Sequence, residues 1–351
     1  MPHRDVISWN AILAAHRLAG DPLKAFRRFL DMLRLSFRPT CSTLATIISA
    51  SPPAAISQLH AAVLQSGHHS NTIVGTALIA GHIADGNLAE ARLHFDAVEN
   101  RNAFAWTIMV AGYLRRGCFS DALCLFAAAP RPNSFACSAA LAASAGLCSL
   151  RCGESIHAQI LKGGTPLDAA LTTALVDMYG RCGEADRAAA AFSDSSAGGS
   201  VAAWNAMIGA MGRNGRSAEA TEGLRGMTAA GLAPDGTTFV HVLSACAHGG
   251  LIEEGRKIFG AMEREFRVRA GKEHYGCMVD MYGRAGMKEE AELAAEAMPE
   301  EMGAGGYALM ARVYGERGKW EKVKEMKRRM EDAKHKQRGA SWVESVANCI
   351  L

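Results

Sequence analysis

Twelve histidines and ten cysteines are the residues with which this chain could bind a metal or catalyse a reaction. A zinc nucleobase deaminase needs His-x-Glu and Cys-x-x-Cys, because zinc takes three protein ligands while the glutamate moves protons. No histidine has glutamate two residues later, and no Cys-x-x-Cys is present. Cys148 and Cys152, one helical turn apart, could hold a metal with His157, but a packed helix face is the simpler interpretation. We therefore expect no catalytic residue, no metal site or stoichiometric zinc and no cofactor, and interpret the chain as a protein that is not an enzyme.

Small polar residues recur at two places in the sequence and could hydrogen-bond a ligand. The first position holds Asn10, Thr76, Thr107, Ser138, Thr173 and Asn205. The second holds Thr40, Asn102, Asn133, Asp168, Ser200 and Asp235. Residues of these types just before a helix also serve as N-caps, so the second position has a purely local interpretation. An N-cap does not need a polar partner at the first position of its unit, however. The variation of both positions together therefore favours recognition of a ligand.

The overall composition is that of a globular chain with little excess charge. Apolar residues make up 49% of the 351 residues, and the formal net charge is +3. These values exclude a disordered chain and a strongly basic nucleic-acid coat protein, although not a locally basic groove. No apolar run approaches the 18 residues of a membrane span, and neither a secretory signal nor a transit peptide is visible. The scattered cysteines indicate small buried residues in a reducing compartment.

Three kinds of string repeat along the chain at a nearly constant interval. WNAIL begins at Trp9, WTIMV at Trp106 and WNAMI at Trp204, which gives intervals of 106 − 9 = 97 and 204 − 106 = 98 residues. LHAAVLQSG from Leu59 and IHAQILKGG from Ile156 are also 97 residues apart, and ALVDMYGRCG from Ala174 is matched by CMVDMYGRAG from Cys277. Units of about 31 to 36 residues therefore alternate, which is the sequence signature of a repeat array.

Each unit reads as two amphipathic helices joined by a short turn. Trp204, Ile208 and Met211 form one apolar stripe at helical spacing, and Ala220, Leu224 and Met227 form a second after the turn at Gly215. The same two stripes occur in other units, as at Trp106, Val110 and Tyr113 and at Ala25, Phe29 and Met32. One hairpin is too small to bury both of its stripes, so neighbours must stack on it. The sequence predicts an all-α, right-handed superhelical solenoid of helix-turn-helix repeats.

The motif V-x-x-W-N-A-M-I…G-R-x-x-E-A…M…G-x-x-P-D, over Val201 to Asp235, resembles the pentatricopeptide repeat more closely than the peptide-binding tetratricopeptide repeat. The alternating long and short units resemble the plant P-L-S subclass of that family. The stretch YALMARVYGERGKWEKVKEMKRRM…GASWVES, from Tyr307 to Ser345, resembles the E-type extension that follows such arrays.

The resemblance implies a domain organisation for the whole chain. Residues 1–5 resemble the end of a preceding repeat, 6–303 form nine repeats, 304–345 a partial E-type extension and 346–351 a tail. The nine repeats are expected at 6–40, 41–71, 72–102, 103–133, 134–168, 169–200, 201–235, 236–271 and 272–303.

The resemblance also gives the polar pairs a role, because pentatricopeptide repeats read one RNA base per repeat through these two positions. Asp accepts only, which suits the imino N–H of uracil or guanine, whereas Asn can also donate to adenine or cytosine. The family implies purines for Thr or Ser at the first position and pyrimidines for Asn. Repeats 72–102 and 103–133 are thus expected to prefer A, repeat 201–235 U and repeat 134–168 weakly G. Val240 and Gly276 leave the last two repeats with little to read.

The segment from Glu316 to Arg338 is the most basic part of the chain, with ten Lys or Arg against five Asp or Glu. Trp320, Val323, Met326 and Met330 form its expected apolar stripe. Two interpretations stay open. The segment is a helix that contacts phosphates or a protein partner, or it is a capping helix with a solvated outer face.

Together these observations predict a protein that binds single-stranded organellar RNA, in the mitochondrion or the chloroplast by family resemblance. The expected role is to specify a C-to-U editing site for a deaminase or other editing factor supplied in trans, with no membrane contact. A peptide-binding helical scaffold and a truncated relic without function are the alternatives.

Overall fold

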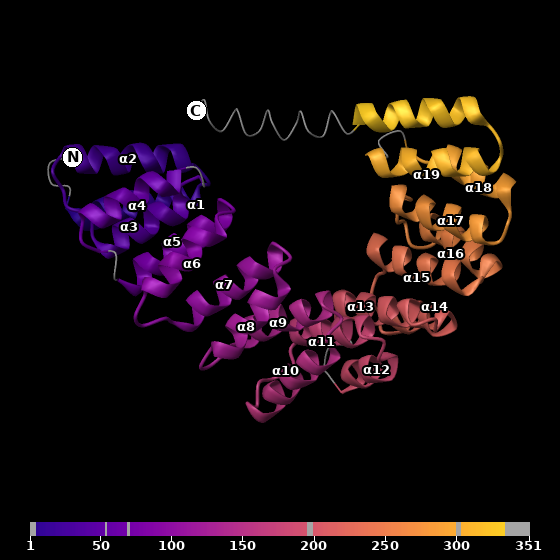
Figure 1. Ribbon diagram of the computed structural model, residues 1–351, viewed down its shortest axis with the longest axis horizontal. Helices are drawn as coiled ribbons and strands as arrows, with labels where there is room; N and C mark the ends of the chain where they lie inside the picture. The colour runs from indigo at the N-terminus through magenta and orange to yellow at the C-terminus, as the bar shows by residue number, and fades with distance from the viewer. Residues whose placement is uncertain (1–4, 53–54, 69–70, 195–198, 300–302, 334–351) are drawn as a thin grey trace. The chain divides into compact units, whose positions relative to one another are not determined.

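The computed structural model describes residues 5–52, 55–68, 71–194, 199–299 and 303–333, and this part of the chain consists of α-helices joined by short turns, without a strand (Figure 1). The predicted all-α fold is therefore confirmed. Residues 1–4 and 334–351 are not described. The expected tail (346–351), the last part of the expected extension (334–345) and nearly all of the expected remnant of a preceding repeat (1–5) therefore lie outside the described residues. The contacts divide the chain into two compact units, Met1–Leu147 and Cys148–Leu351.

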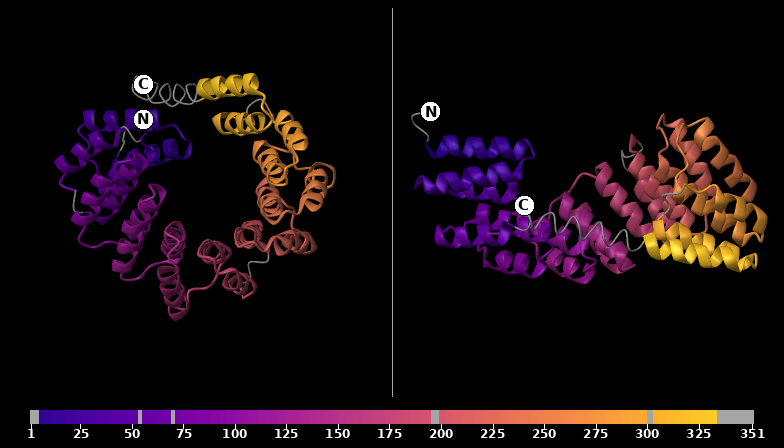
Figure 2. Two further views of the ribbon diagram at one scale, coloured as in Figure 1. Left: turned by 45° about the vertical axis from the view of Figure 1, so that its right-hand side comes forward. Right: turned by 90° about the horizontal axis from the view of Figure 1, so that it is seen from above.

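The described residues of the first unit form nine helices. They are α1 (Val6–Leu18), α2 (Pro22–Arg34), α3 (Cys41–Ala50), α4 (Ile56–Gln65), α5 (Thr72–Ala84), α6 (Leu88–Ala97), α7 (Ala103–Arg115), α8 (Phe119–Ala128) and α9 (Ser134–Gly146). Successive helices lie side by side, and the odd-numbered ones also pack on one another in order, α1 on α3, α3 on α5, α5 on α7 and α7 on α9 (Figures 1 and 2).

The second unit repeats this pattern. Its helices are α10 (Leu150–Lys162), α11 (Ala169–Arg181), α12 (Ala185–Ser193), α13 (Val201–Arg213), α14 (Ser217–Ala229), α15 (Gly236–Gly249), α16 (Ile252–Arg264), α17 (Lys272–Arg284), α18 (Lys288–Glu296) and α19 (Gly303–Glu316), followed by a helical segment at 320–333. Helices α11, α13, α15, α17 and α19 pack on one another in order. Each of the nine expected repeats holds two of the helices α1 to α18.

Local sequence explains where these helices begin and end. Asn102 and Asn133 precede α7 and α9, and each amide oxygen accepts a hydrogen bond from a backbone N–H of the first helical turn. The turn between the two helices of a repeat places a glycine at positive φ, as at Gly117 (72°) and Gly215 (76°). Only glycine adopts this conformation without strain, so the turn can be short.

The apolar stripes pack each hairpin on its neighbours, as the periodicity predicts. Ile208 and Met211 of the first stripe are buried, and so are Ala220 and Met227 of the second. The half-buried Trp204 lies edge-on to Phe192 of the preceding repeat, with ring centroids 4.8 Å apart. Trp106 and Phe95 make the same contact in the first unit at 4.9 Å, so the sequence interval of 97 to 98 residues recurs as a packing interval.

Among the described residues, no helix combines the length and the apolar character that crossing a bilayer requires.

Candidate functional site

The polar pairs lie at the junctions between successive repeats, and the junction after α13 shows their arrangement. The Nδ2 of Asn205 donates to Oδ1 of Asp235 over 3.1 Å, and the Oγ1 of Thr238 donates to Oδ1 of Asn205 over 2.7 Å. The backbone N–H of Thr238 donates to the same Asp235 oxygen over 2.8 Å, which makes Asp235 the N-cap of α15. Asn205 is buried, whereas Asp235 is exposed. The pair thus links a buried anchor to a polar group that solvent or a ligand can reach.

The electrostatics of this junction keep Asp235 ionised. Partial burial raises the pKa of its carboxyl group, but hydrogen bonds from Thr238 and Asn205 outweigh burial and hold the pKa below its usual value. At neutral pH the side chain therefore carries a negative charge and can only accept hydrogen bonds. That property is the one on which the expected reading of uracil depends.

The junction after α1 has the same network in a neutral form. Thr43 donates through Oγ1 to Oδ1 of Asn10 over 2.6 Å, and its backbone N–H donates to the hydroxyl of Thr40 over 3.3 Å. Thr40 is the exposed N-cap of α3, and its own N–H donates to Thr43 in a capping box. In both junctions a threonine three residues into the next helix connects the two predicted positions. Sequence analysis missed this third residue, although a capping-box spacing marks it.

The two repeats expected to prefer adenine differ in how their pairs are joined. Thr107 donates to Oδ1 of Asn133 over 3.0 Å as well as to the carbonyl oxygen of Ala103. Thr76 donates to the carbonyl oxygen of Thr72, and Asn102 caps α7 by accepting from the N–H of Ala105. The structure therefore shows a direct side-chain bond between the two positions in only one of these repeats, 103–133.

The remaining predicted residues take local positions. Asp168 caps α11 by accepting from the N–H of Leu171 over 2.8 Å, and Thr173 donates to the carbonyl oxygen of Ala169. Ser200 precedes α13 without a capping bond from its side chain. Ser138 is half-buried on α9 of the first unit, and Asp168 belongs to the second unit. Capping is thus a real function of Thr40, Asn102, Asn133, Asp168 and Asp235.

Exposed apolar side chains accompany the polar pairs in the first unit. Ile7, Ile73, Phe104 and Phe135 are each the second residue of an odd-numbered helix, three residues before Asn10, Thr76, Thr107 and Ser138. Their exposed fractions lie between 61% and 76%. A spacing of three places an apolar side chain beside the polar one on the same helix face. Sequence analysis did not single them out, although aromatic residues that repeat at fixed positions outside the core stripe are a readable signal.

The three residues weighed as a metal site do not come together. Cys148 is exposed before α10, Cys152 is half-buried on α10, and Nδ1 of His157 hydrogen-bonds the Tyr179 hydroxyl over 2.8 Å. Within the described residues, one group brings three possible ligands close together, and it consists of His60, His82 and His94. Sequence analysis missed this group because its members lie 22 and 12 residues apart on three helices.

The basic helix at 320–333 packs against α18 and α19 with part of its charge neutralised. Lys319 donates to Oε2 of the buried Glu292 over 2.7 Å, and Lys322 donates to Glu296 over 2.9 Å. Val323 and Met326 are buried as the stripe predicts. Trp320 is 65% exposed, so its assignment to that stripe is wrong. It is the first residue of the helix, and its side chain lies outside the buried contact with α18 and α19. These contacts favour a capping role for this face of the helix.

The chain is similar to proteins of one known repeat family. The pentatricopeptide repeat model (PPR repeat) matches residues 7–37, 104–128, 202–232, 237–265 and 273–301. The Arabidopsis thaliana pentatricopeptide repeat-containing protein At1g03540 is 33% identical over 83% of this chain and 49% of its own length. The mitochondrial pentatricopeptide repeat-containing protein At2g03880 of the same plant is 31% identical over 98% of this chain and 60% of its own length. The chain therefore spans about half the length of the curated relatives it matches.

A solved structure agrees with this relationship at the level of the fold. It is that of the pentatricopeptide repeat protein PPR10, which is from maize, in complex with an 18-nt psaJ RNA element. It superposes with a TM-score of 0.77 and 18% sequence identity over 94% of this chain and 50% of that one. The repeat spacing, the stacked helix hairpins, the matched repeat segments and the relatives agree, and the chain contains pentatricopeptide repeats over the matched segments.

Proposed function

We propose that this protein binds single-stranded RNA and reads bases through the polar pairs at its repeat junctions. One observation carries the proposal. At the junction after α13 the buried side chain of Asn205 donates to the exposed N-cap side chain of Asp235 and fixes its orientation. A cap alone needs no such anchor. Support comes from PPR10, whose fold this chain shares and which was solved in complex with an RNA element.

The hydrogen-bonding groups at the junctions suit particular bases. The bonds from Asn205 and Thr238 reach Oδ1 of Asp235, so the other carboxylate oxygen is the one that would accept the N3–H of uracil. Asn133 holds its Oδ1 toward Thr107 and the N–H of Ala136, which leaves its amide N–H₂ to donate to a ring nitrogen of adenine. Repeats 72–102 and 103–133 would prefer A, 201–235 U and, weakly, 134–168 G.

The exposed apolar residues supply affinity without sequence preference. A splayed base offers a π-face, and an aromatic or branched side chain beside the reading position would stack on it. Phe104 and Phe135 stand beside Thr107 and Ser138 on their helices and are 61% and 76% exposed. The first unit would therefore stack bases more strongly than α11 and α13, which carry Ala170 and Ala202 at the same place.

The finer role is the specification of C-to-U editing sites in an organelle, with a deaminase or another editing factor supplied in trans. Two observations support it: the resemblance of the repeats to the P-L-S subclass with a partial E-type extension, and a relative that is named mitochondrial. The sequence contains no His-x-Glu or Cys-x-x-Cys motif with which to deaminate cytosine itself. The same resemblance suggests the chloroplast as the other compartment. A peptide scaffold is the competing function, and selectivity for bases separates the two.

The decisive experiment replaces Asp235 with asparagine. Donors from Asn205 and Thr238 fix the side-chain oxygen, so in Asp235→Asn the new amide nitrogen takes the place of the outward carboxylate oxygen. An outward acceptor becomes an outward donor, and the preference of this repeat should move from U toward C. The expected change is about tenfold, since a wrong base costs roughly 1–3 kcal/mol. Gel-shift titrations with U or C opposite this repeat measure it.

The control is Asp21→Asn, which makes the same chemical change at the N-cap of α2, away from any repeat junction. It should leave base preference unchanged. A duplex competitor tests the other half of the proposal, because stacked repeats can read only splayed bases. Equal binding of single-stranded and duplex RNA, or equal weakening of both RNAs by Asp235→Asn, would contradict the proposal.

A further inference from the structure

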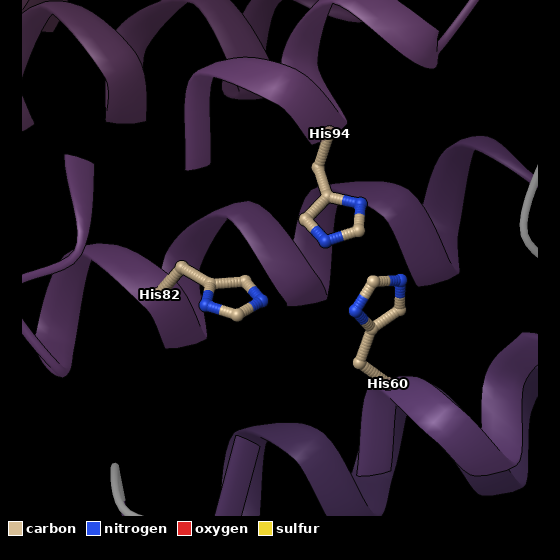
Figure 3. A group of neighbouring side chains, drawn as sticks. All are labelled: His60, His82 and His94. Atoms are coloured by element: carbon tan, nitrogen blue, oxygen red, sulfur yellow. The ribbon is translucent and has the colours of Figure 1, made fainter. Parts of the chain in front are cut away.

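Three histidines from three neighbouring helices converge in the first unit. His60 comes from α4, His82 from the last turn of α5 and His94 from α6, and their rings face a common point (Figure 3). Ring centroids lie 4.3 Å apart for His60 and His94, and 5.0 Å apart for His82 and His94. One nitrogen of each ring lies within 4.8 Å of one nitrogen of each other ring. The cluster bridges two successive repeats, because α4 belongs to 41–71 and α5 and α6 to 72–102.

Three ring nitrogens of this cluster have no hydrogen-bond partner within the described part of the chain. Neither ring nitrogen of His82 hydrogen-bonds a described residue, nor does Nε2 of His94, and all three atoms are buried. The side chain of His82 is only 2% exposed. Unpartnered buried nitrogens destabilise a fold unless another group satisfies them. The cluster therefore needs an explanation beyond packing.

The corresponding positions of the second unit do not form a histidine cluster. At an interval of 97 residues, His60 corresponds to His157, His82 to Tyr179 and His94 to Ala191. There Nδ1 of His157 hydrogen-bonds the hydroxyl of Tyr179, and a buried alanine fills the third position. The scaffold thus folds with a satisfied His–Tyr pair, and in the first unit two positions carry histidine instead. Both changes add an imidazole that points at the same spot.

Against the expectation of no metal site drawn from the sequence, we propose that His60, His82 and His94 bind one zinc ion, with the fourth tetrahedral position left to a non-protein ligand. Imidazole nitrogens are common zinc ligands, and three of them with an open fourth position form an established type of site. A tetrahedral ion with zinc–nitrogen distances of about 2.05 Å holds its ligand nitrogens about 3.3 Å apart. Nitrogens already within 4.8 Å reach that spacing through small side-chain rotations.

Two of the three imidazoles are in the form that binds a metal. Burial, together with the neighbouring rings, lowers the pKa of His94 to about 4, and burial also lowers the pKa of His82. Both imidazoles are therefore neutral at physiological pH, the form in which histidine binds a metal. The carboxylate of Glu90 lies near enough to act on both rings and would favour a positive ion.

The ion would cross-link the two repeats 41–71 and 72–102. It would join α4 to α5 and α6. Helices α4 and α5 otherwise meet through apolar contacts in a cluster that includes the buried Ile56, Leu59 and Leu78. Because zinc would bind the folded form and not the unfolded chain, its binding would stabilise this part of the array.

The experiment uses the full chain after removal of metal with a chelator and dialysis. Zinc chloride is titrated against a chromophoric zinc chelator, and thermal unfolding is followed with and without zinc. One zinc should bind per chain, and the unfolding temperature should rise with zinc concentration. His94→Ala and His82→Tyr introduce the residues of the second unit, so both variants should fold without metal. Each should lose zinc affinity by more than about tenfold, a loss that even an outer-shell partner can cause.

Two controls separate this site from other zinc binding. His157→Ala removes the corresponding histidine of the second unit and should leave affinity unchanged. Cobalt should give the visible bands of a tetrahedral nitrogen site without the intense near-ultraviolet band of thiolate ligands, which excludes the cysteines. Absence of saturable one-to-one binding, unchanged affinity in His94→Ala and His82→Tyr, or a thiolate band would each overturn the proposal. None of these readouts requires RNA, so the result is independent of the proposed function.

Discussion

At the scale of single residues, capping and the proposed base reading would use different atoms of the same side chain. The N–H of Thr238 and the amide of Asn205 both donate to Oδ1 of Asp235, so one oxygen holds the helix and the other accepts neither of these bonds. The sequence alone sets these two interpretations against each other. The structure makes them compatible, because a base edge can meet the oxygen that the cap does not use.

Phe135 tests the stacking contribution at this scale. Its side chain is 76% exposed beside a reading position, so Phe135→Ala should weaken RNA binding while leaving stability nearly unchanged. Loss of one stacked base costs about 1–3 kcal/mol, which corresponds to about 5- to 150-fold in Kd. Fluorescence anisotropy with a labelled single strand measures the change.

The matched control for Phe135 is Leu93→Ala. Leu93 is 63% exposed in the same unit but lies on α6, the second helix of its repeat. This variant should bind RNA like the unmodified protein. If both substitutions weaken binding equally, the loss reflects general apolar surface and the stacking role of Phe135 is wrong.

Sequence reasoning recovers those site residues that obey a period and misses those that depend on tertiary packing. Asn10, Thr107 and Asn205 can be predicted because they recur one step from an apolar stripe. The cluster of His60, His82 and His94 cannot, because its residues follow no metal-binding spacing and meet only through the packing of three helices. The exposed Phe104 and Phe135 look like core residues until the helix that carries them is oriented.

At the scale of helices, the contact between α18 and the helix at 320–333 depends on one buried acid. Glu292 is 6% exposed and lies within ion-pair distance of Lys319, Arg317 and Lys322. The charges are visible in the sequence, but their partners are not, because the acids belong to α18, two helices before the segment at 320–333. That is why the sequence leaves both phosphate contact and capping open for this segment.

Glu292→Gln should destabilise this contact by about 1 kcal/mol at neutral pH. This is less than the roughly 1.5–3 kcal/mol of a buried bond to a charged group, because the lysine partners are half-exposed. The hydrogen bond from Lys319, aided by nearby positive charges, lowers the pKa of Glu292. Its contribution is therefore full above the unfolded pKa of about 4.3 and is lost as the pH falls through the lower folded value.

Thermal unfolding of both proteins at neutral pH and near pH 3 checks this sign. The difference between them should shrink on acidification. Glu289→Gln serves as the control, because that side chain is 80% exposed and should matter little. A difference that persists unchanged in acid would show that Glu292 acts through packing and not through charge.

At the scale of the whole molecule, the sequence predicts the fold well because the fold is periodic. Every hairpin repeats the same two stripes, so an error in one repeat is corrected by the next, and the array of stacked hairpins is confirmed by the match to PPR10. The prediction for Trp320 is wrong where the period ends and no following repeat constrains it. The nearly balanced charge, 38 basic against 35 acidic residues, is also a property of the whole chain.

This balance predicts only a moderate salt dependence of RNA binding. Lys327 and Arg328 are exposed basic residues on the outer side of the helix at 320–333. Replacing both with glutamine should reduce the slope of log K against log salt by about 0.7 for each phosphate that the helix no longer neutralises. Arg151→Gln with Lys162→Gln on α10 removes the same charge elsewhere and should leave the slope closer to that of the unmodified protein. Equal slopes for the two double variants would assign the basic helix to capping alone.

The hydrogen-bond networks at the repeat junctions determine where such an array can be spliced into a chimera. Asn10 reaches its N-cap partner through Thr43 of the following repeat, and Asn205 bonds Asp235 and Thr238 at the start of the next. The smallest transferable module therefore runs from inside one repeat to the first turn of its successor. A recombinant chimera spliced at a repeat boundary would separate each anchor from the side chain it orients, whereas a splice in the second helix would carry the recognition unit across intact.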